Sequence, residues 1–279
     1  MATHHQRLLP VPKGDEIAMD HISFSQLSMY LRCGEQYHRR YILGEKIPPS
    51  GALVRGKCGH KALEANFRQK IESRKDIKKK EILSVFSDEW KRALSEEEVA
   101  WTPDELDGNS PKKAAGKMKD SGIALVSIYH KEQSPQVQPI EVEQEFRVDF
   151  DDGFPPLVGI IDRVTEDYAV EDDKFVSKSP SAFDMITDVQ LTCYQLGYQI
   201  REGKPPIRLR KRFAISTSTP KSVCFEIIPR NKEQMDRFLN RLQAAMGGIR
   251  KGVFLPAAND SWACSERFCG YWSTCKVRK

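Results

Sequence analysis

The feature that most restricts the fold is an apolar, strand-like segment that ends in charge. Residues 157–164 form an apolar run interrupted only by Asp162 and Arg163, and a turn-forming segment with two prolines precedes it. A short apolar run of this kind is typical of a buried central strand. Burying the charge of Asp162 is costly unless something compensates for it, and a metal ion would do so. We therefore expect an α/β core with a charged residue inside it.

Two further segments are predicted to pair with this strand. Residues 141–150 alternate between apolar and polar side chains, and residues 168–175 follow a turn, so the three segments form a meander. Asp172 and Lys174 are two residues apart and share one face of the third strand. Asp162 on the preceding strand is expected beside them. Two carboxylates and a lysine suit a hard cation such as Mg²⁺ or Mn²⁺.

This combination suits the hydrolysis of a phosphodiester. The reaction needs a hydroxide nucleophile and neutralisation of the charge that develops at phosphorus, and a carboxylate-bound Mg²⁺ or Mn²⁺ supplies both. Lys174 can activate the water and stabilise negative charge.

The remaining segments are predicted to be mainly helical. Apolar spacing predicts the following elements: helices over 21–44, 53–69, 70–100, 112–133, 188–201 and 231–249, and a hairpin from 212–216 and 223–228. Together they predict a central mixed sheet flanked by helices.

Bulk properties limit the class of protein. The chain has 279 residues, 39% of them apolar, which suits one sizeable core, and its net charge of +5 is compatible with nucleic-acid binding. The absence of a long apolar run predicts no membrane span. Residues 1–20 lack the apolar segment of a secretory signal and are expected to form a flexible arm of a cytoplasmic protein.

The seven cysteines are expected to stay reduced in the cytoplasm and to serve as core residues or metal ligands. Cys264, Cys269 and Cys275 lie within twelve residues of an irregular, aromatic segment, and Cys33 is the candidate fourth ligand. A shared zinc ion is one possible ligand of these cysteines, although the chain lacks the tight C-x₂-C pairs that zinc prefers.

Four motifs together resemble a known family. Asp162 followed by Asp172-Asp173-Lys174 resembles the Asp…(D/E)-x-K signature of the PD-(D/E)XK nucleases. Residues 56–64 resemble the G-x-x-x-H-x-x-x-E motif of the RecB-like branch, and residues 190–194 resemble its Q-x-x-x-Y motif. The motifs also follow one another in the order that the family shows.

The resemblance implies a restriction-endonuclease-like fold and a Mg²⁺- or Mn²⁺-dependent deoxyribonuclease, either an exonuclease or an end-processing enzyme of DNA recombination or repair. The implied roles are as follows: His60, Asp162 and Asp172 bind the metal with the main-chain carbonyl of Asp173, Lys174 assists the water, Gln190 orients the water or phosphate, and Tyr194 contacts the DNA backbone. The sequence departs from the family at Asp173, where tyrosine is frequent, and at Phe175-Val176, where threonine and glycine are common.

One upstream cysteine with a C-terminal trio resembles the iron–sulfur nucleases, which include the AddB subunit and the CRISPR-adaptation nucleases. The resemblance implies that Cys33, Cys264, Cys269 and Cys275 hold a structural [4Fe–4S] cluster that joins the two ends of the domain. The expected organisation is a single nuclease domain over 21–279, with a helical insertion over 66–135 and an iron–sulfur tail over 256–279.

Two other classes of protein stay open at this stage. One is a non-catalytic DNA-binding subunit of a recombination complex, and the other is a zinc-containing interaction protein. The expected partners are single-stranded DNA or DNA ends, and a helicase or recombinase. The sequence does not predict the polarity of digestion or the oligomeric state.

Overall fold

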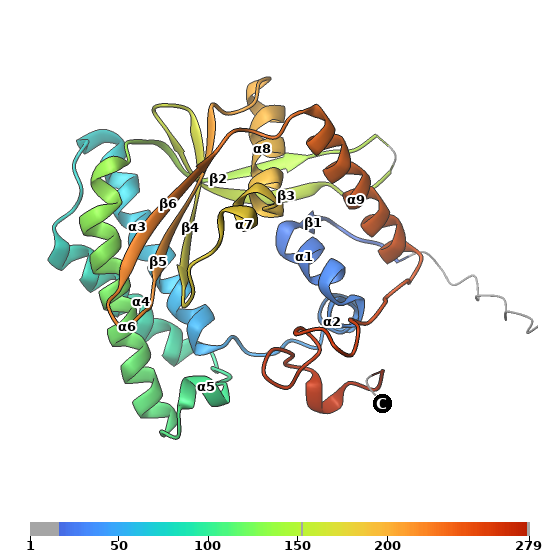
Figure 1. The fold of residues 1–279 in the computed structure, drawn as a ribbon, viewed down its shortest axis with the longest axis horizontal. Helices are drawn as coiled ribbons and strands as arrows, with labels where there is room; N and C mark the ends of the chain where they lie inside the picture. Colours follow the sequence, from blue (N-terminus) through green and yellow to red (C-terminus); the bar gives the residue numbers. More distant parts are fainter. Residues whose placement is uncertain (1–16, 152, 278–279) are drawn as a thin grey trace, which may run out of the picture.

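The computed structural model describes residues 17–151 and 153–277, so most of the predicted N-terminal arm lies outside the described residues. Within these ranges the chain forms a six-stranded mixed sheet with helices on both faces (Figure 1). The strands are β1 (Ile22–Ser23), β2 (Pro139–Val148), β3 (Leu157–Thr165), β4 (Ala169–Val176), β5 (Arg208–Ile215) and β6 (Lys221–Ile227). The α-helices are α1 (Phe24–Arg32), α2 (Gly34–Tyr37), α3 (Gly51–Ser73), α4 (Lys79–Glu96), α5 (Pro103–Leu106), α6 (Pro111–Glu132), α7 (Ala182–Ile186), α8 (Val189–Glu202) and α9 (Lys232–Arg250).

The sheet contains the predicted meander at its centre. Strands β2, β3 and β4 pair antiparallel in chain order, as the sequence predicts. Strand β5 pairs parallel to β4, and β6 returns antiparallel to β5. The short β1 adds parallel to β3 on the other side. The expected α/β fold with a mixed central sheet is therefore confirmed.

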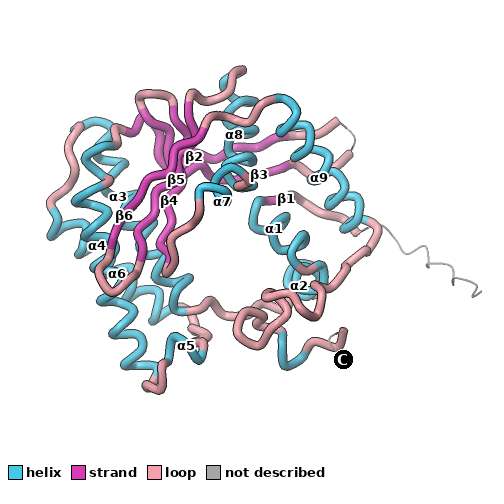
Figure 2. The backbone as a smooth tube through the Cα atoms, in the orientation of Figure 1, coloured by secondary structure: helices cyan, strands magenta, loops and turns pink. Residues whose placement is uncertain are grey.

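Each face of the sheet has its own apolar core. One core unites α1, α8 and α9 with one face, and the other unites α3, α4 and α6 with the opposite face. Figure 2 shows the strands at the centre of the molecule with helices around them. Side chains alternate between faces along β4, so Val170 enters the first core while Phe175 packs against the second. In the described part of the chain, no helix has the length and apolar character needed to cross a bilayer.

The first predicted helix, over 21–44, is interrupted. Ser23 caps α1 in a capping box with Gln26, and α1 ends at Arg32 because Cys33 adopts an extended conformation with φ of −161°. Helix α2 and a π-helical turn (His38–Ile42) follow. The interruption turns Cys33 toward the C-terminal tail, where the main-chain N–H of Ala257 donates to its Sγ at 3.3 Å.

The helical region between α3 and β2 differs from the prediction in its boundaries. Helix α3 continues to Ser73 and ends where Arg74 takes a left-handed conformation, and α4 begins only at Lys79. The predicted start of a helical insertion at residue 66 thus falls inside α3. Phe86 and Trp90 of α4 are buried in the same core as residues of the sheet, so these helices form one of its covering layers.

Candidate active site

The candidate site lies where two strands of the meander separate. Strands β3 and β4 are paired at Val164–Val170, next to the turn, and at Arg163–Glu171. Their pairing ends at Arg163–Glu171. Asp162 and Asp172 come directly after this last pair. Beyond the end of the pairing, the Oδ2 atom of Asp162 accepts the main-chain N–H of Asp173 at 2.8 Å. The side chain of Asp162 thereby joins the two diverging strands.

Close packing of α3 on β4 brings His60 to this point. A side chain at Gly59 would meet the ring of Phe175 at 2.5 Å, so the absence of one lets the helix approach the strand. His60 follows on α3, and its Nδ1 lies 3.4 Å from Oδ2 of Asp162. Phe175 is thus a packing residue beneath the helix that carries the histidine.

A third ligand joins this pair from β2. One ligand atom each of His60, Glu143 and Asp162 lies within 4.8 Å of the others, a spacing at which one cation can contact all three. Glu143 has a φ of +52° inside a strand, a left-handed conformation that costs a non-glycine residue about 1–2 kcal/mol. Such strain is frequent at functional sites. The sequence analysis missed Glu143, because it is one of three glutamates in an ordinary alternating strand.

The protonation of Asp162 reflects its surroundings. Burial raises the pKa of Asp162 to about 7, while the neighbouring His60 lowers the pKa and the charge of Asp172 raises it. A carboxyl group that is buried beside other acids favours a nearby positive charge. The cluster therefore has the donor set and the electrostatics of a divalent-cation site.

Asp172 lies beside this cluster and is completely buried. Its Oδ1 accepts from Nζ of Lys174 at 2.7 Å. Its Oδ2 has no hydrogen-bond partner among the described residues, although Nζ of Lys211 lies 3.4 Å away. A buried carboxylate oxygen without a hydrogen bond is costly unless a cation contacts it. These residues therefore fit a bound Mg²⁺ or Mn²⁺.

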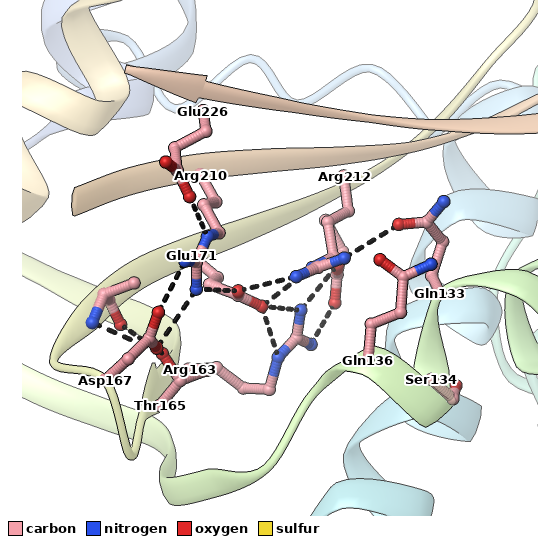
Figure 3. A network of polar contacts seen from close by, with 12 residues as sticks. Gln133, Ser134, Gln136, Arg163, Thr165, Asp167, Glu171, Arg210, Arg212 and Glu226 are labelled. Carbon is pink, nitrogen blue, oxygen red and sulfur yellow. Dashed lines mark hydrogen bonds and ion pairs between the residues drawn. The ribbon is translucent and has the colours of Figure 1, made fainter. Parts of the chain in front are cut away.

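Asp173 points to the opposite face of β4. Its Oδ1 accepts from the hydroxyl of Tyr129 at 2.5 Å and from Nη2 of Arg163 at 2.9 Å. Arg163 and Arg212 both bind Glu171, which extends the buried ionic network across β3, β4 and β5 (Figure 3). The side chain of Asp173 is thus a structural partner, and metal binding by its main-chain carbonyl stays a prediction.

Helix α8 contributes the predicted Gln190 and Tyr194. Nε2 of Gln190 donates to the hydroxyl of Tyr194 at 2.9 Å. Tyr194 is only 6% exposed, and its ring packs edge-on against Phe146. This placement makes Tyr194 a support for Gln190, and it does not favour the predicted contact with the DNA backbone.

Lys211 is a second residue that the sequence analysis missed. It is 4% exposed on β5, and its Nζ lies 2.5 Å from Oδ2 of Asp188 and 3.4 Å from both Asp172 and Gln190. Asp188 also caps α8, because its Oδ1 accepts the N–H of Leu191. Lys211 thus connects the start of α8 to the carboxylate of Asp172. The sequence analysis starts the hairpin at residue 212. Lys211 therefore lies outside the predicted strand, where a lysine is expected to be exposed.

A large groove opens in front of the cluster. It runs between α3 and α4, and its lining includes four site residues and charged side chains of both signs: His60, Glu143, Asp162, Lys174, Lys57, Lys61, Arg92, Glu64, Glu89 and Glu97. The site is therefore accessible to a substrate larger than the cluster itself.

The four predicted cluster ligands gather at one place. Cys33, Cys264, Cys269 and Cys275 line a single cavity between the α1–α2 break and the tail. All four belong to the described residues, and no three of their sulfur atoms lie within 4.8 Å of one another. None of the seven cysteines, all of which are described, forms a disulfide.

A mixed sheet with helices on both faces and a carboxylate–lysine site at its diverging strands defines the class of restriction-endonuclease-like nuclease folds. A family model described as the PD-(D/E)XK nuclease superfamily matches residues 21–276. The chain belongs to this superfamily and is therefore a nuclease by family, with phosphodiester hydrolysis as its class of reaction.

A solved structure supports the fold. A protein of Eubacterium rectale, provisionally named an exonuclease, superposes with a TM-score of 0.56 and 11% identity over 88% of this chain and 87% of its own. A second structure, SSO0001, gives a TM-score of 0.41 and 13% identity over 94% of this chain and 89% of its own. The search of curated proteins gave no match.

Proposed function

We propose that this protein is a Mg²⁺- or Mn²⁺-dependent deoxyribonuclease of the RecB-like branch. Its action is exonucleolytic or end-processing, and it serves DNA recombination or repair. The observation that carries the proposal is the cation-type cluster of His60, Glu143 and Asp162 beside the Asp172–Lys174 pair. The name of the structurally similar protein from Eubacterium rectale, provisionally an exonuclease, supports the exonucleolytic part of this proposal.

Each residue of the site has a role in this proposal. His60, Glu143, Asp162 and Asp172 would hold the cation, which when bound lowers the pKa of a water molecule and neutralises charge on the phosphate. Lys174 is held by Asp172 and is 29% exposed, so its ammonium group can also reach a water or phosphate oxygen. Gln190, fixed by Tyr194, orients the same water or phosphate.

We further propose that the four tail cysteines hold a [4Fe–4S] cluster. They line one cavity, which supports a shared inorganic group. A tetrahedral zinc ion with bonds of about 2.3 Å draws its sulfur ligands to about 3.8 Å from one another. Among the described residues, no three of these sulfur atoms lie within 4.8 Å of one another, so they are not gathered as closely as the ligands of one zinc ion. Wider spacing favours a cluster, in which each thiolate binds a different iron atom.

Digestion of labelled DNA tests the nuclease. Protein purified without oxygen is incubated with 5′- or 3′-labelled linear DNA and with circular DNA, in Mn²⁺, Mg²⁺ or EDTA. Metal-dependent shortening of linear but not circular DNA is expected, with loss of this activity in Asp162→Asn. Binding of DNA without any cleavage would instead favour the non-catalytic subunit. Capture of a helicase or recombinase by the same protein would test the proposed partner.

A brown colour, absorbance near 400 nm and about four iron atoms per chain would support the cluster. A colourless protein that contains one zinc ion would contradict it.

A further inference from the structure

Arg230, outside the cation-type cluster, is a buried arginine whose partners are all neutral. It is 9% exposed, and its Nε donates to the hydroxyl of Thr192 at 3.1 Å. Its Nη2 donates to the main-chain carbonyls of Met185 and Asp188 at 3.0 and 3.2 Å. Among residues 17–151 and 153–277, Arg230 forms no ion pair, and its Nη1 has no hydrogen-bond partner.

The electrostatics of Arg230 favour the binding of an anion. Burial lowers the pKa of Arg230, and only the more distant charge of Asp188 opposes this. A buried cation whose partners are neutral retains much of its desolvation cost, which an anion at the remaining N–H groups would offset.

Arg230 belongs to the lining of a pocket that is rich in arginine. The pocket lies between the start of α8 and one face of α9, and it is lined by Arg230, Arg237, Arg241, Gln234, Thr187, Thr192, Ile186, Val189 and Phe238. No acidic side chain is among them. Arg237 and Arg241 are four residues apart on α9 and therefore share a face. Neither forms an ion pair within the described ranges, so both can bind a ligand.

The pocket is connected to the candidate active site through one residue. Arg230 donates to the main-chain carbonyl of Asp188, and the side-chain carboxylate of Asp188 binds Lys211. Nζ of Lys211 in turn lies 3.4 Å from Oδ2 of Asp172. The start of α8 thus links the pocket to Asp172 beside the cation-type cluster.

We propose that the pocket of Arg230, Arg237 and Arg241 binds a phosphate group of the nucleic-acid strand whose cleavage is proposed above. Guanidinium groups bind phosphate oxygens through paired N–H donors, and three of them around a pocket without carboxylates favour an anion with several acceptor oxygens. The inference rests on the proposed function in assigning the phosphate to DNA, whereas the anion site itself rests on Arg230 and its pocket. The strand phosphate is either a 5′ end or an internal phosphodiester, and free phosphate, which has the same chemistry, is the competing ligand that the test must separate.

The test uses two charge-matched double variants of α9. Arg237→Gln with Arg241→Gln removes two pocket arginines and leaves the buried Arg230 in place. Lys232→Gln with Lys251→Gln removes the same charge from exposed positions at the two ends of this helix, outside the pocket. Binding is measured in EDTA by fluorescence anisotropy with single-stranded oligonucleotides that carry a 5′-phosphate or a 5′-hydroxyl, and by calorimetry with inorganic phosphate.

We expect the arginine variant to bind the oligonucleotide at least about tenfold more weakly than wild type, as the removal of hydrogen bonds to a charged group predicts. The lysine variant should bind within about twofold, because Lys232 and Lys251 do not line the pocket. The salt dependence of binding should fall by about 0.7 in slope for each phosphate that the variant no longer neutralises. Equal affinities of the two variants would overturn the proposal.

The ligands identify the source of the phosphate. A preference for the 5′-phosphate that disappears in the arginine variant assigns a strand end, and equal weakening for both oligonucleotides assigns an internal phosphodiester. Arginine-dependent binding of inorganic phosphate, with oligonucleotide binding equal in the two variants, would overturn the assignment to a nucleic-acid strand. Because the binding measurements are made in EDTA, they test the anion site independently of cleavage. A failed cleavage assay would therefore contradict the proposed function without contradicting the anion site.

Discussion

At the scale of single residues, Asp172 shows how the site balances its charge. One oxygen accepts from Lys174, and the other lies 3.4 Å from Lys211 without forming a hydrogen bond. Two ammonium groups thus stabilise a completely buried carboxylate. Because a divalent cation would bind the same carboxylate, Lys211 is expected to compete with it while it holds the start of α8.

Replacing Lys211 by methionine should therefore separate metal binding from catalysis. Loss of the ammonium group near Asp172 should tighten Mn²⁺ binding by roughly tenfold, a modest Coulomb effect at this distance. Cleavage should nevertheless slow, because α8 and Gln190 lose their connection to β5. Calorimetric Mn²⁺ titration and single-turnover cleavage measure the two effects.

Lys211→Arg, which keeps the charge, is the control and should bind Mn²⁺ as wild type does. Weaker Mn²⁺ binding by the methionine variant would show that Lys211 acts mainly by holding Asp172 in place.

Glu143 should prove to be a cation ligand. Glu143→Gln is expected to weaken Mn²⁺ binding by roughly tenfold or more, as the loss of a supporting carboxylate does at other metal sites. Glu145→Gln, an exposed position on the same strand, is the matched control and should change little. Equal Mn²⁺ affinity of both variants would exclude Glu143 from the site.

The sequence predicts some of these residues and not others for a physical reason. Asp162, Asp172 and Lys174 stand out because charge interrupts or ends apolar strands, and His60 stands out by its motif. Glu143 lies in a strand where polar residues are expected, and only its left-handed backbone turns it toward the site. Lys211 comes to lie beside Asp172 only through the parallel pairing of β4 with β5, which depends on contacts distant in sequence.

At the scale of elements, β4 is fixed from both faces. Asp172 and Lys174 pair with each other at the candidate site, whereas Glu171 and Asp173 enter the buried network with Arg163. Removing one partner of a buried ionic network leaves uncompensated charge, which is more costly than the loss of an exposed pair. The network therefore holds the strand that carries the candidate catalytic residues.

Replacing Arg163 by methionine should lower the free energy of unfolding by about 3–5 kcal/mol, because Glu171 and Asp173 lose a buried partner. Urea denaturation followed by circular dichroism measures this change. Arg147→Met, which removes an exposed ion pair on β2, should cost less than about 1 kcal/mol. Similar losses in both variants would contradict a central role for the network.

The order and type of the main elements could be predicted, but several boundaries could not. Apolar spacing is strong along β3, β4 and α9, and these elements lie where the pattern places them. The break at Arg74 has no proline or glycine to announce it, and at the break beside Cys33 only Gly34 does so. Contacts distant in sequence accompany both breaks, since Cys33 meets the tail and the side chain of Arg74 pairs with Glu166.

At the scale of the whole molecule, the tail closes against the N-terminal helices. Besides the four cysteines, the hydroxyl of Tyr271 donates to the carbonyl of Glu45, and the guanidinium of Arg39 lies 4.7 Å from the ring of Tyr271. Such an irregular segment has little apolar core of its own, so a group bound by its cysteines would contribute much of its order.

Loss of that group should loosen the tail and leave the sheet folded. Cys33→Ser is expected to make trypsin cut rapidly at Arg267 and Lys276, while the body of the domain resists. Cys224→Ser, which alters a cysteine of β6 outside the cavity, is the control and should resist cleavage throughout. Equal protease resistance of both variants would show that the tail is ordered without the bound group.

The central claim is that Lys174 and its neighbouring carboxylates form the active site of a DNA nuclease. The most direct measurement compares Mn²⁺-dependent cleavage of end-labelled DNA by Lys174→Ala with that of Lys178→Ala, an exposed lysine just beyond β4. The account predicts that Lys174→Ala loses about 10²–10³ in cleavage rate while it still binds DNA, and that Lys178→Ala cleaves as wild type does. Cleavage by Lys174→Ala at the wild-type rate would contradict the assignment of this site.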